Sequence, residues 1–511
     1  METILSIDLG TTGLKVALVG LDGNVIASEG GEYPILSPRP GWAEQDPELW
    51  WKALVEGCGR LRQGSPEAFA STVGVGVCGQ MHTQVCLDAQ GCVLRPAISW
   101  MDQRSAVQVG SINCDPGRKA LVFQETQNLA TTTYTAPQLR WIQENEPQVW
   151  SATRHVLVAK DFLKYRLTGA MAIDFAEASG TLLFNVAEQR WSDAMFDLFG
   201  IPRSALPEAA PSDTQIGEVT AEASRITGIR VGTPVVNGSS DNSAAALGAG
   251  MVCSGQVTLI IGTAGVITVC SDKPLPDARD RTLCWNYCLR DRWVSLGITQ
   301  TAGESLNWFK NAFDARETTG RGDIFEEYNN AVRTVPAGCE GLVFLPYLNG
   351  ERTPYWDSTA RGVYFGVGLN TGKGHFVRAI MEGVSFALRH CVETVESLGI
   401  KVDQIQAVGG GLKSPAWLEI LSHVMRRPIR TVKVPDTGHI GNMLLCARGL
   451  GLIGSIGEYA RKVVRYEQEA YHPEKDPIYE RQYGVFLELY DDLRPCYRRA
   501  CLPPEEDRIT T

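Results

Sequence analysis

The chain has 511 residues, of which 44% are hydrophobic and 21% charged, and single cores stop growing at roughly 250–300 residues, so two globular domains are expected. Its net charge of -10 argues against a nucleic-acid partner, which would leave a basic surface. No stretch approaches the roughly 20 apolar residues of a membrane helix, and the chain enters a strand without a signal-peptide pattern. The 14 cysteines include no CxxC pair. We therefore expect a cytoplasmic protein with reduced thiols that binds neither nucleic acid nor membrane.

The first predicted element is a β-hairpin, in which two β-branched runs flank the turn Gly10-Thr11-Thr12-Gly13. A second turn at Asp22-Gly23-Asn24 adds a third antiparallel strand. Glycine turns let backbone amides approach phosphate oxygens, and threonine hydroxyls add donors. Asp8 ends the first strand, where a carboxylate could hold Mg²⁺. Taken alone, the pattern favours a hairpin without a ligand; together with the second copy described below, it favours a phosphate site.

The next elements place polar side chains at a second strand end. A helix is predicted from Pro47 to about Leu61, with Asp46 as its N-cap. The apolar run 73–78 predicts a buried strand, and Gln80-Met81-His82 follow it, where they could bind sugar hydroxyls. Trp100 and Asp102 are further pocket candidates. A lone histidine is also commonly structural, and residues 104–200 read as mostly helical.

Asp241 is the strongest candidate for a catalytic group. It follows the strand 235–238 and precedes a small-residue helix over 243–248. A carboxylate there could accept a proton from an attacking hydroxyl, although it could equally serve as the helix N-cap. We place a domain boundary just after this helix, giving domains 1–250 and 251–490 and a polar tail over 491–511.

The second half repeats the opening hairpin. Its turn reads Gly262-Thr263-Ala264-Gly265, and Ile260 stands where the first copy has Asp8. A helix is predicted over 376–398, and then a strand over 405–408 that runs into Gly409-Gly410-Gly411 and a helix from about Ser414. Two such hairpins predict a duplicated fold that grips a polyphosphate between its copies. The glycine run is consistent with close approach to a nucleotide, or with a tight strand–helix turn.

Several motifs together resemble the FGGY carbohydrate kinases, and among them the xylulokinases. The most specific match is Gly362–Val367 followed, after seven residues, by His375–Glu382, which is similar to the second signature of the family. Asp8–Gly13 resembles the N-terminal phosphate motif of the family. Further similar segments are Trp42–Pro47, Gly79–His82, Phe344–Leu348 and Gly350–Pro354. The resemblance covers about residues 3–454.

This resemblance implies an α/β fold of two actin-like, ribonuclease-H-like domains with sugar and MgATP in a cleft between them. It implies a cytoplasmic homodimer that phosphorylates a ketopentose, D-xylulose first, at the 5-hydroxyl. Asp241 would be the general base and Asp8 the metal ligand. The sugar would contact Gln80, Met81, His82, Trp100, Asp102 and Asn242. ATP would contact Gly10, Thr11, Thr12, Gly13, Lys15, Gly262, Thr263, Gly410, Gly411 and Ser414.

The sequence departs from the family pattern at five places, which leaves the exact sugar open. The family usually has glycine at the positions of Thr83 and of Ser239-Ser240, and serine at the position of Ala264. It usually has lysine at the position of Gln138, and a patch of small residues where this chain has Leu445-Cys446-Ala447. The alternatives are an FGGY-type kinase of ribulose, L-xylulose, gluconate or glycerol. A more distant alternative is an actin- or Hsp70-like nucleotide-binding protein, which would explain both hairpins but not Asp241 beside Gln80-Met81-His82.

Overall fold

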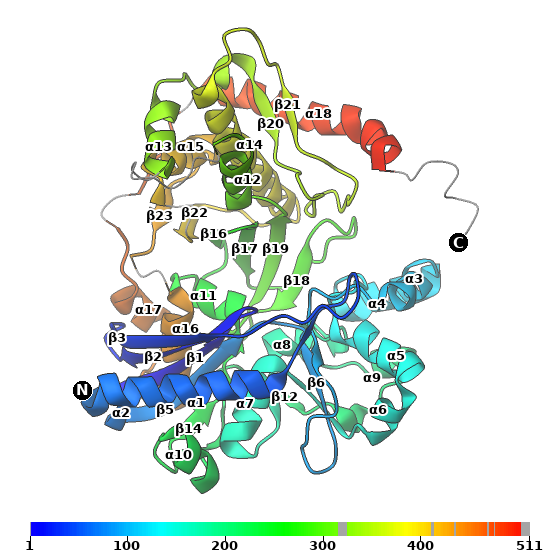
Figure 1. Ribbon diagram of the computed structural model, residues 1–511, viewed down its shortest axis with the longest axis vertical. Helices are drawn as coiled ribbons and strands as arrows, with labels where there is room; N and C mark the ends of the chain where they lie inside the picture. The colour runs from blue at the N-terminus through cyan, green and yellow to red at the C-terminus, as the bar shows by residue number, and fades with distance from the viewer. Residues whose placement is uncertain are drawn as a thin grey trace.

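Two mixed β-sheets, one from each half of the chain, organise the computed structural model (Figure 1). The structure describes residues 2–314, 324–409, 413–433, 436–467, 470–474 and 476–501. Each sheet is covered by helices, and the described residues include no helix long and apolar enough to cross a membrane.

The first sheet contains the predicted opening hairpin. Its strand order is β13-β14-β5-β1-β2-β3, with β15 also pairing with β5. The pairs β1–β2 and β2–β3 are antiparallel, whereas β1–β5 and β5–β14 are parallel. The strands are β1 Thr3–Leu9, β2 Gly13–Gly20, β3 Val25–Glu32, β5 Thr72–Gly79, β13 Gln215–Glu218, β14 Pro234–Val236 and β15 Ser239–Ser240.

The second sheet repeats this pattern. Its order is β18-β19-β17-β16-β22-β23, in which β16–β17 and β17–β19 are antiparallel and β16–β22 and β22–β23 parallel. The predicted duplication is therefore confirmed, with β16 in the place of β1 and β22 in the place of β5. The strands are β16 Gln256–Ile261, β17 Gly265–Ser271, β18 Leu283–Asn286, β19 Trp293–Thr299, β22 Gln404–Val408 and β23 Ile429–Thr431.

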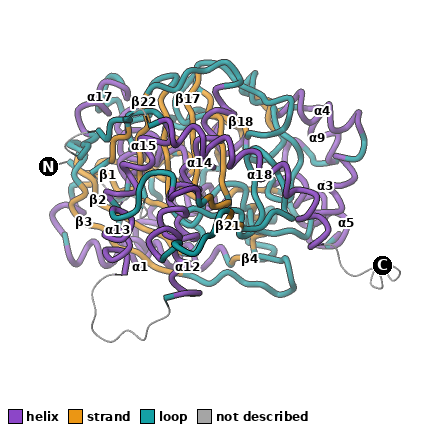
Figure 2. Tube along the Cα trace, turned by 90° about the horizontal axis from the view of Figure 1, so that it is seen from above, coloured by secondary structure: helices purple, strands orange, loops and turns teal. Residues whose placement is uncertain are grey.

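Small sheets and helices complete the first half. The helices α3, α4, α5 and α9 gather at one end of the molecule and β1–β3 at the other (Figure 2). The helices are α1 Pro47–Gly64, α2 Pro66–Ala70, α3 Ala106–Asn113, α4 Pro116–Thr126, α5 Thr135–Asn145, α6 Pro147–Ala152, α7 Ala159–Thr168, α8 Phe175–Ser179, α9 Asp193–Phe199, α10 Ala221–Thr227 and α11 Asp241–Gly248. The remaining strands are β4 Glu44–Gln45, β6 Gln84–Leu87, β7 Ala97–Ile98, β8 His155–Val158, β9 Ala172–Asp174, β10 Phe184–Asn185, β11 Arg190–Trp191 and β12 Glu208–Ala210.

The predicted helix starts hold in both halves. Asp46 caps α1 by accepting a hydrogen bond from the Glu48 amide, and Ser414 caps α15 by accepting one from Trp417. The helices of the second half are α12 Gly303–Phe313, α13 Ile324–Arg333, α14 Lys373–Glu396, α15 Pro415–Met425, α16 Thr437–Gly449, α17 Ile456–Val463 and α18 Pro477–Cys501, and a small sheet pairs β20 Val343–Leu345 with β21 Val363–Phe365.

Helix α16 joins the two halves, because it packs on the first sheet although it lies late in the chain (Figure 1). Its Asn442 donates to the Ser6 hydroxyl and to the Ile7 carbonyl at 3.0 Å each. It also crosses α11 closely: a Cβ on Gly441 would lie 2.0 Å from the Ala244 carbonyl oxygen. Residues 437–449 therefore belong structurally with the first sheet.

The segment that ends at residue 501 is more helical than the sequence suggests. Helix α18 runs through residue 501, across the predicted start of a polar tail at 491, and Tyr490 and Tyr497 are buried in the core of the second half. The start of the predicted tail is thus helical as far as Cys501. The boundary near 250 stays a prediction.

Candidate functional site

The site is built around the end of strand β5, where three chain segments meet. In the parallel pairing of β5 with β1 and β15, Cys78 lies opposite both Asp8 and Ser239. Asp241 follows β15 directly, so Asp8 and Asp241 emerge on opposite sides of β5. The first turn of α16 reaches the same place, since a Cβ on Gly438 would lie 3.2 Å from Asp8 Oδ2.

Asp241 is the first residue of α11 and does not cap it. The cap is Ser240, whose hydroxyl accepts a hydrogen bond from the Ser243 amide, so the alternative of Asp241 as N-cap is wrong. Asp241 is partly buried. Burial and the nearby Asp8 carboxylate raise the pKa of Asp241 to about 7, although the Asn242 amide, 2.6 Å from Oδ1, acts in the opposite direction. Its carboxylate can therefore exchange a proton near neutral pH.

The first glycine turn is held by its carbonyl groups. Tyr33 donates its hydroxyl to the Gly10 carbonyl and its amide to the Thr12 carbonyl, and Gln45 Nε2 donates to the Thr11 carbonyl at 2.5 Å. The Gly10 amide closes the turn onto the Gly13 carbonyl at 2.9 Å. Thr12 is exposed at the tip, and Thr11 and Gly13 are partly exposed. The carbonyl groups of the turn are thus hydrogen-bonded to the protein, while its tip is exposed to solvent, as a phosphate site requires.

Lys15 follows this turn and connects the two halves. Its Nζ lies 2.9 Å from Asp436 Oδ1, just before α16, and both side chains are about half exposed. It is thus held by an ion pair on the hairpin, and its contact with ATP stays a prediction.

The second glycine turn is fixed by the start of α12. Ala302 donates its amide to the Thr263 carbonyl at 2.8 Å, and Gly303 donates to the Gly262 carbonyl at 2.9 Å. Gly262 and Thr263 are exposed, and Ala264 is partly buried. The two turns thus occupy equivalent positions in the two sheets, with Asp8 two residues before the first turn and Ile260 two residues before the second.

The predicted sugar residues lie together at the end of β5. His82 has a φ of 68°, and its Nδ1 lies 2.6 Å from the Gly180 carbonyl. Because a carbonyl can only accept, Nδ1 carries the proton and Nε2 is left as an acceptor. Burial lowers the pKa of His82 to about 4, so the ring is neutral. Met81 is also buried and Gln80 Nε2 donates to Gln45 Oε1 at 2.8 Å.

Trp100 and Thr83 connect the sugar residues to the first turn. The Trp100 indole donates to the Thr11 hydroxyl at 3.1 Å, and its amide donates to the Thr83 hydroxyl at 3.2 Å. That hydroxyl in turn donates to Gln80 Oε1 at 3.2 Å. Thr83, which departs from the family pattern, therefore fixes both Gln80 and the loop that carries Trp100.

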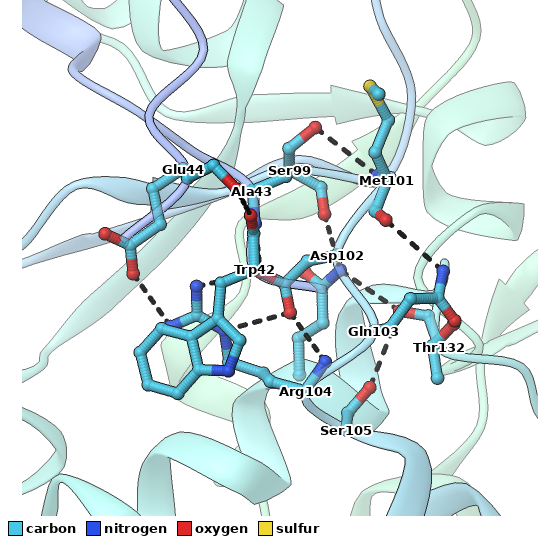
Figure 3. Close-up of polar contacts among 12 residues, drawn as sticks. Trp42, Ala43, Glu44, Ser99, Met101, Asp102, Gln103, Arg104, Ser105 and Thr132 are labelled. Carbon is cyan, nitrogen blue, oxygen red and sulfur yellow. Dashed lines mark hydrogen bonds and ion pairs between the residues drawn. The ribbon is translucent and has the colours of Figure 1, made fainter. Parts of the chain in front are cut away.

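Asp102 has a different environment from the one expected for a sugar ligand. Its fully buried carboxylate accepts from the Ala43 amide at 2.6 Å and forms a two-point ion pair with Arg104 (Figure 3). Arg104 also lies 2.7 Å from Glu44 and stacks 3.7 Å above the Trp42 ring. Asp102 therefore holds two loops together, and we assign it a supporting role in place of the expected contact with the sugar.

The other predicted residues are distributed as follows. Asn242 accepts from the Thr268 hydroxyl of β17 at 3.1 Å, so it links the halves beside Asp241. Ser414 caps α15 and also contacts Asn329. Gly410 and Gly411 lie outside the described residues. Gln138, a departure from the family pattern, donates to the Ser99 carbonyl at 3.0 Å, and Leu445 is buried in the core of the first half.

The residues at Asp8 suit Mg²⁺ bound together with phosphates. Among the described residues, no group of three or more His, Cys, Asp or Glu side chains could hold a metal ion by itself. Mg²⁺ commonly takes one or two carboxylates and completes its shell with water and substrate phosphates. Asp8 supplies one such carboxylate near the end of β1, so the donor set fits the ion.

Some residues at the site gave no signal in the sequence. Tyr134 and Trp285 contact the His82 ring at centroid distances of 5.2 and 5.4 Å, and Trp285 belongs to the second half. Glu351 is buried with a pKa raised to about 7 by that burial, and it anchors the following Arg352. Tyr134 and Trp285 lie in no local pattern that separates them from ordinary core residues, and Glu351 lies in the family-like segment Gly350–Pro354 but is not singled out there.

Comparison with known proteins agrees with this geometry. Residues 3–248 match the N-terminal domain of the FGGY family of carbohydrate kinases, and residues 257–450 match its C-terminal domain. The chain is 34% identical to a xylulose kinase of Lactococcus lactis, over 96% of this chain and 97% of the relative. A xylulose kinase structure from Rhodospirillum rubrum has a TM-score of 0.90 at 31% identity, covering 97% and 100% of the two chains. A gluconate kinase structure from Lactobacillus acidophilus also has a TM-score of 0.90, at 27% identity, covering 98% and 99%.

The two halves of the chain therefore match the two domains of one family in the same order. The two sheets show the same duplicated α/β fold. Membership makes the protein a phosphotransferase that acts on a sugar and uses ATP. The chain belongs to the FGGY family of carbohydrate kinases.

Proposed function

We propose that this kinase phosphorylates D-xylulose to D-xylulose 5-phosphate, with Asp241 as the general base. The observation that carries the proposal is a carboxylate with a pKa of about 7 at the end of β15, across β5 from Asp8. A base with a pKa near the working pH combines the correct protonation state with a useful driving force for proton transfer.

The residues divide the work of phosphoryl transfer between them. Asp241 would take the proton of the attacking sugar hydroxyl as the oxygen bonds to the γ-phosphorus and the bond to ADP breaks. Asp8 would hold Mg²⁺, which supplies charge neutralisation to the phosphates when bound. The two glycine turns would position the phosphates through amides and the hydroxyls of Thr11, Thr12 and Thr263. Once the proton has left the hydroxyl, it remains on Asp241 until product release.

His82 supports recognition of a neutral sugar. Its Nε2 can accept a hydrogen bond from a sugar hydroxyl, because Nδ1 donates to Gly180 and the ring stays neutral. Its position is fixed by Tyr134 and Trp285 on two sides. The xylulose kinase relatives support the ketopentose as the first choice.

A sugar acid such as gluconate is the second candidate. Burial, and in a smaller part the positive charge of Arg352, lower the pKa of His82, which places that cation near the sugar residues. A guanidinium near the sugar could pair with a substrate carboxylate. The likeness to a gluconate kinase structure agrees with this alternative.

The substrate is tested by a coupled ADP-release screen with D-xylulose, D-ribulose, L-xylulose, gluconate and glycerol. We expect D-xylulose to give the highest kcat/KM, and a preference for gluconate would replace it with the sugar-acid assignment. Mass spectrometry of the sugar product then checks directly that one phosphoryl group has been transferred.

The base is tested by Asp241→Asn, which keeps the shape of the side chain and removes its basicity. We expect kcat to fall by about 10²–10⁴-fold with ATP binding retained. Asp115→Asn is the matched control, since Asn caps α4 as well as Asp does and Asp115 is exposed at the start of that helix. Turnover of Asp241→Asn within a few-fold of the wild type would sink the assignment. The homodimer stays a prediction, tested by light scattering.

A further inference from the structure

A cluster of charged side chains is buried behind the strand end that carries Asp241. Its members, Lys160, Asp161, Lys164, Asp174 and Glu177, are at most 1% exposed. Lys160 Nζ lies 2.7 Å from Asp161 Oδ1 and 2.9 Å from Asp174 Oδ1, and Lys164 Nζ lies 2.8 Å from Asp161 Oδ1. Buried ions are strongly destabilising unless they are paired, so the lysines and aspartates depend on one another.

The charges of the cluster balance. Burial raises the pKa of Glu177 well above its usual range, so this carboxyl is neutral and two lysines face two aspartates. Burial lowers the pKa of Lys164 to about 8, while the Asp161 and Asp174 carboxylates keep Lys160 protonated. Asp174 is thus the ionic partner of Lys160, whose Nζ lies 2.9 Å from Asp174 Oδ1.

The cluster is hydrogen-bonded to the segment that leads to Asp241. Lys164 Nζ donates to the Asn237 carbonyl at 2.9 Å and also contacts the Asn237 side chain. The Ser239 hydroxyl donates to Asp174 Oδ2 at 3.1 Å. Both contacts hold residues 237–240 from one side, while Ser239 and Ser240 pair with β5 on the other. The segment is thus fixed on two sides immediately before Asp241.

Asp174 Oδ2 also accepts a second, similar hydroxyl. Ser212 donates to it at 2.9 Å, and Ser212 is buried like Ser239. Ser212 lies in a loop that does not carry Asp241. Replacing either serine by alanine therefore removes one hydroxyl donor from Asp174 Oδ2. Only Ser239 belongs to the segment that leads to Asp241, so Ser212→Ala serves as the control.

We propose that Asp174 is a positioning residue of the kinase reaction, which aims Asp241 at the sugar hydroxyl through the Ser239 side chain. This inference rests on the proposed role of Asp241. A general base must lie about 2.6–3.2 Å from the atom that it deprotonates, and a misplacement of about 1 Å can cost about 10²-fold in rate. Ser239 stands where the family usually has glycine, so this particular link is a property of the present chain.

The test compares Ser239→Ala with Ser212→Ala in the steady-state ADP-release assay, with the sugar that the screen selects. We expect Ser239→Ala to lower kcat about tenfold while the KM values for sugar and ATP change less than about twofold, because positioning affects the transition state more than binding. Ser212→Ala should keep kcat within about twofold of the wild type. Equal losses of kcat in the two variants would show a merely structural cluster and overturn the proposal.

A third variant covers poor folding of Ser239→Ala. Ser239→Cys keeps a weak donor at similar volume and should have a kcat between those of the wild type and Ser239→Ala. A kcat of Ser239→Cys equal to that of the wild type, with Ser239→Ala unfolded, would overturn the positioning role. The proposed function and this inference can fail separately. An active Asp241→Asn variant would refute Asp241 as the base. An inactive Asp241→Asn variant, with equal kcat losses in Ser239→Ala and Ser212→Ala, would refute only the positioning role of Asp174.

Discussion

The close crossing of α11 and α16 makes a strong prediction about Gly441→Ala. The added Cβ would lie 2.0 Å from the Ala244 carbonyl oxygen, whereas ordinary contacts begin at 3.4 Å, so the helices must separate by about 1.4 Å. Overpacking a core costs about 1–3 kcal/mol of stability. Because the added Cβ would meet the backbone of α11 and not a flexible side chain, we expect a cost at the upper end of that range. Replacing a helical glycine returns about 1 kcal/mol, so we expect a net loss of about 2 kcal/mol.

Gly484→Ala is the matched control, because Gly484 lies in α18 and its Cβ would meet nothing within 4 Å. Helix propensity alone then predicts a gain of about 1 kcal/mol. Urea unfolding followed by circular dichroism should place the midpoint of Gly441→Ala below the wild type and that of Gly484→Ala above it. Since α11 begins at Asp241, Gly441→Ala should also lower kcat. A Gly441→Ala midpoint at or above the wild type would refute the close packing of the two helices.

Two further predictions concern buried titratable groups. The pKa of His82 is about 4 in the folded protein and about 6.5 in the unfolded chain. Between these two pH values the unfolded chain binds more protons, so the free energy of unfolding falls as the pH decreases, by about 2 kcal/mol near pH 5. Urea unfolding near pH 7.5 and pH 5 should show a smaller loss for His82→Gln than for the wild type, and an equal loss would contradict it. Burial raises the pKa of Cys58 to about 12, so iodoacetamide at neutral pH should spare it, and mass spectrometry should find label on the exposed thiols Cys92, Cys114 and Cys496. Label on Cys58 in the folded protein would refute its protection.

Local patterns predicted the elements that depend on short-range chemistry. The two glycine hairpins, the N-cap Asp46, a helix start near Ser414 and the long helix α14 all follow from turn residues, caps and apolar spacing. The equivalence of the two hairpins also extended correctly to whole sheets, because each hairpin is joined to a parallel strand in the same order.

Features that depend on distant contacts were not predictable in the same way. Asp102 looks like a pocket residue in the sequence, but its partners Ala43 and Arg104 saturate its carboxylate. Ser240 and Asp241 are both good N-cap residues, and only the pairing of β15 with β5 decides between them. The buried cluster around Lys160 could not be inferred, because its charged residues resemble an ordinary exposed helix surface when read alone.

The position of α16 on the first sheet has a consequence for synthesis of the protein. Asn442 bonds to Ser6 and Ile7, more than 400 residues earlier in the chain, and fills a place beside β1 and β5. A nascent chain that has emerged only to residue 250 holds a complete first sheet with one apolar surface still bare. We expect such an intermediate to recruit chaperones until residues 437–449 leave the ribosome. The first sheet, although it is made first, therefore completes its core only near the end of synthesis.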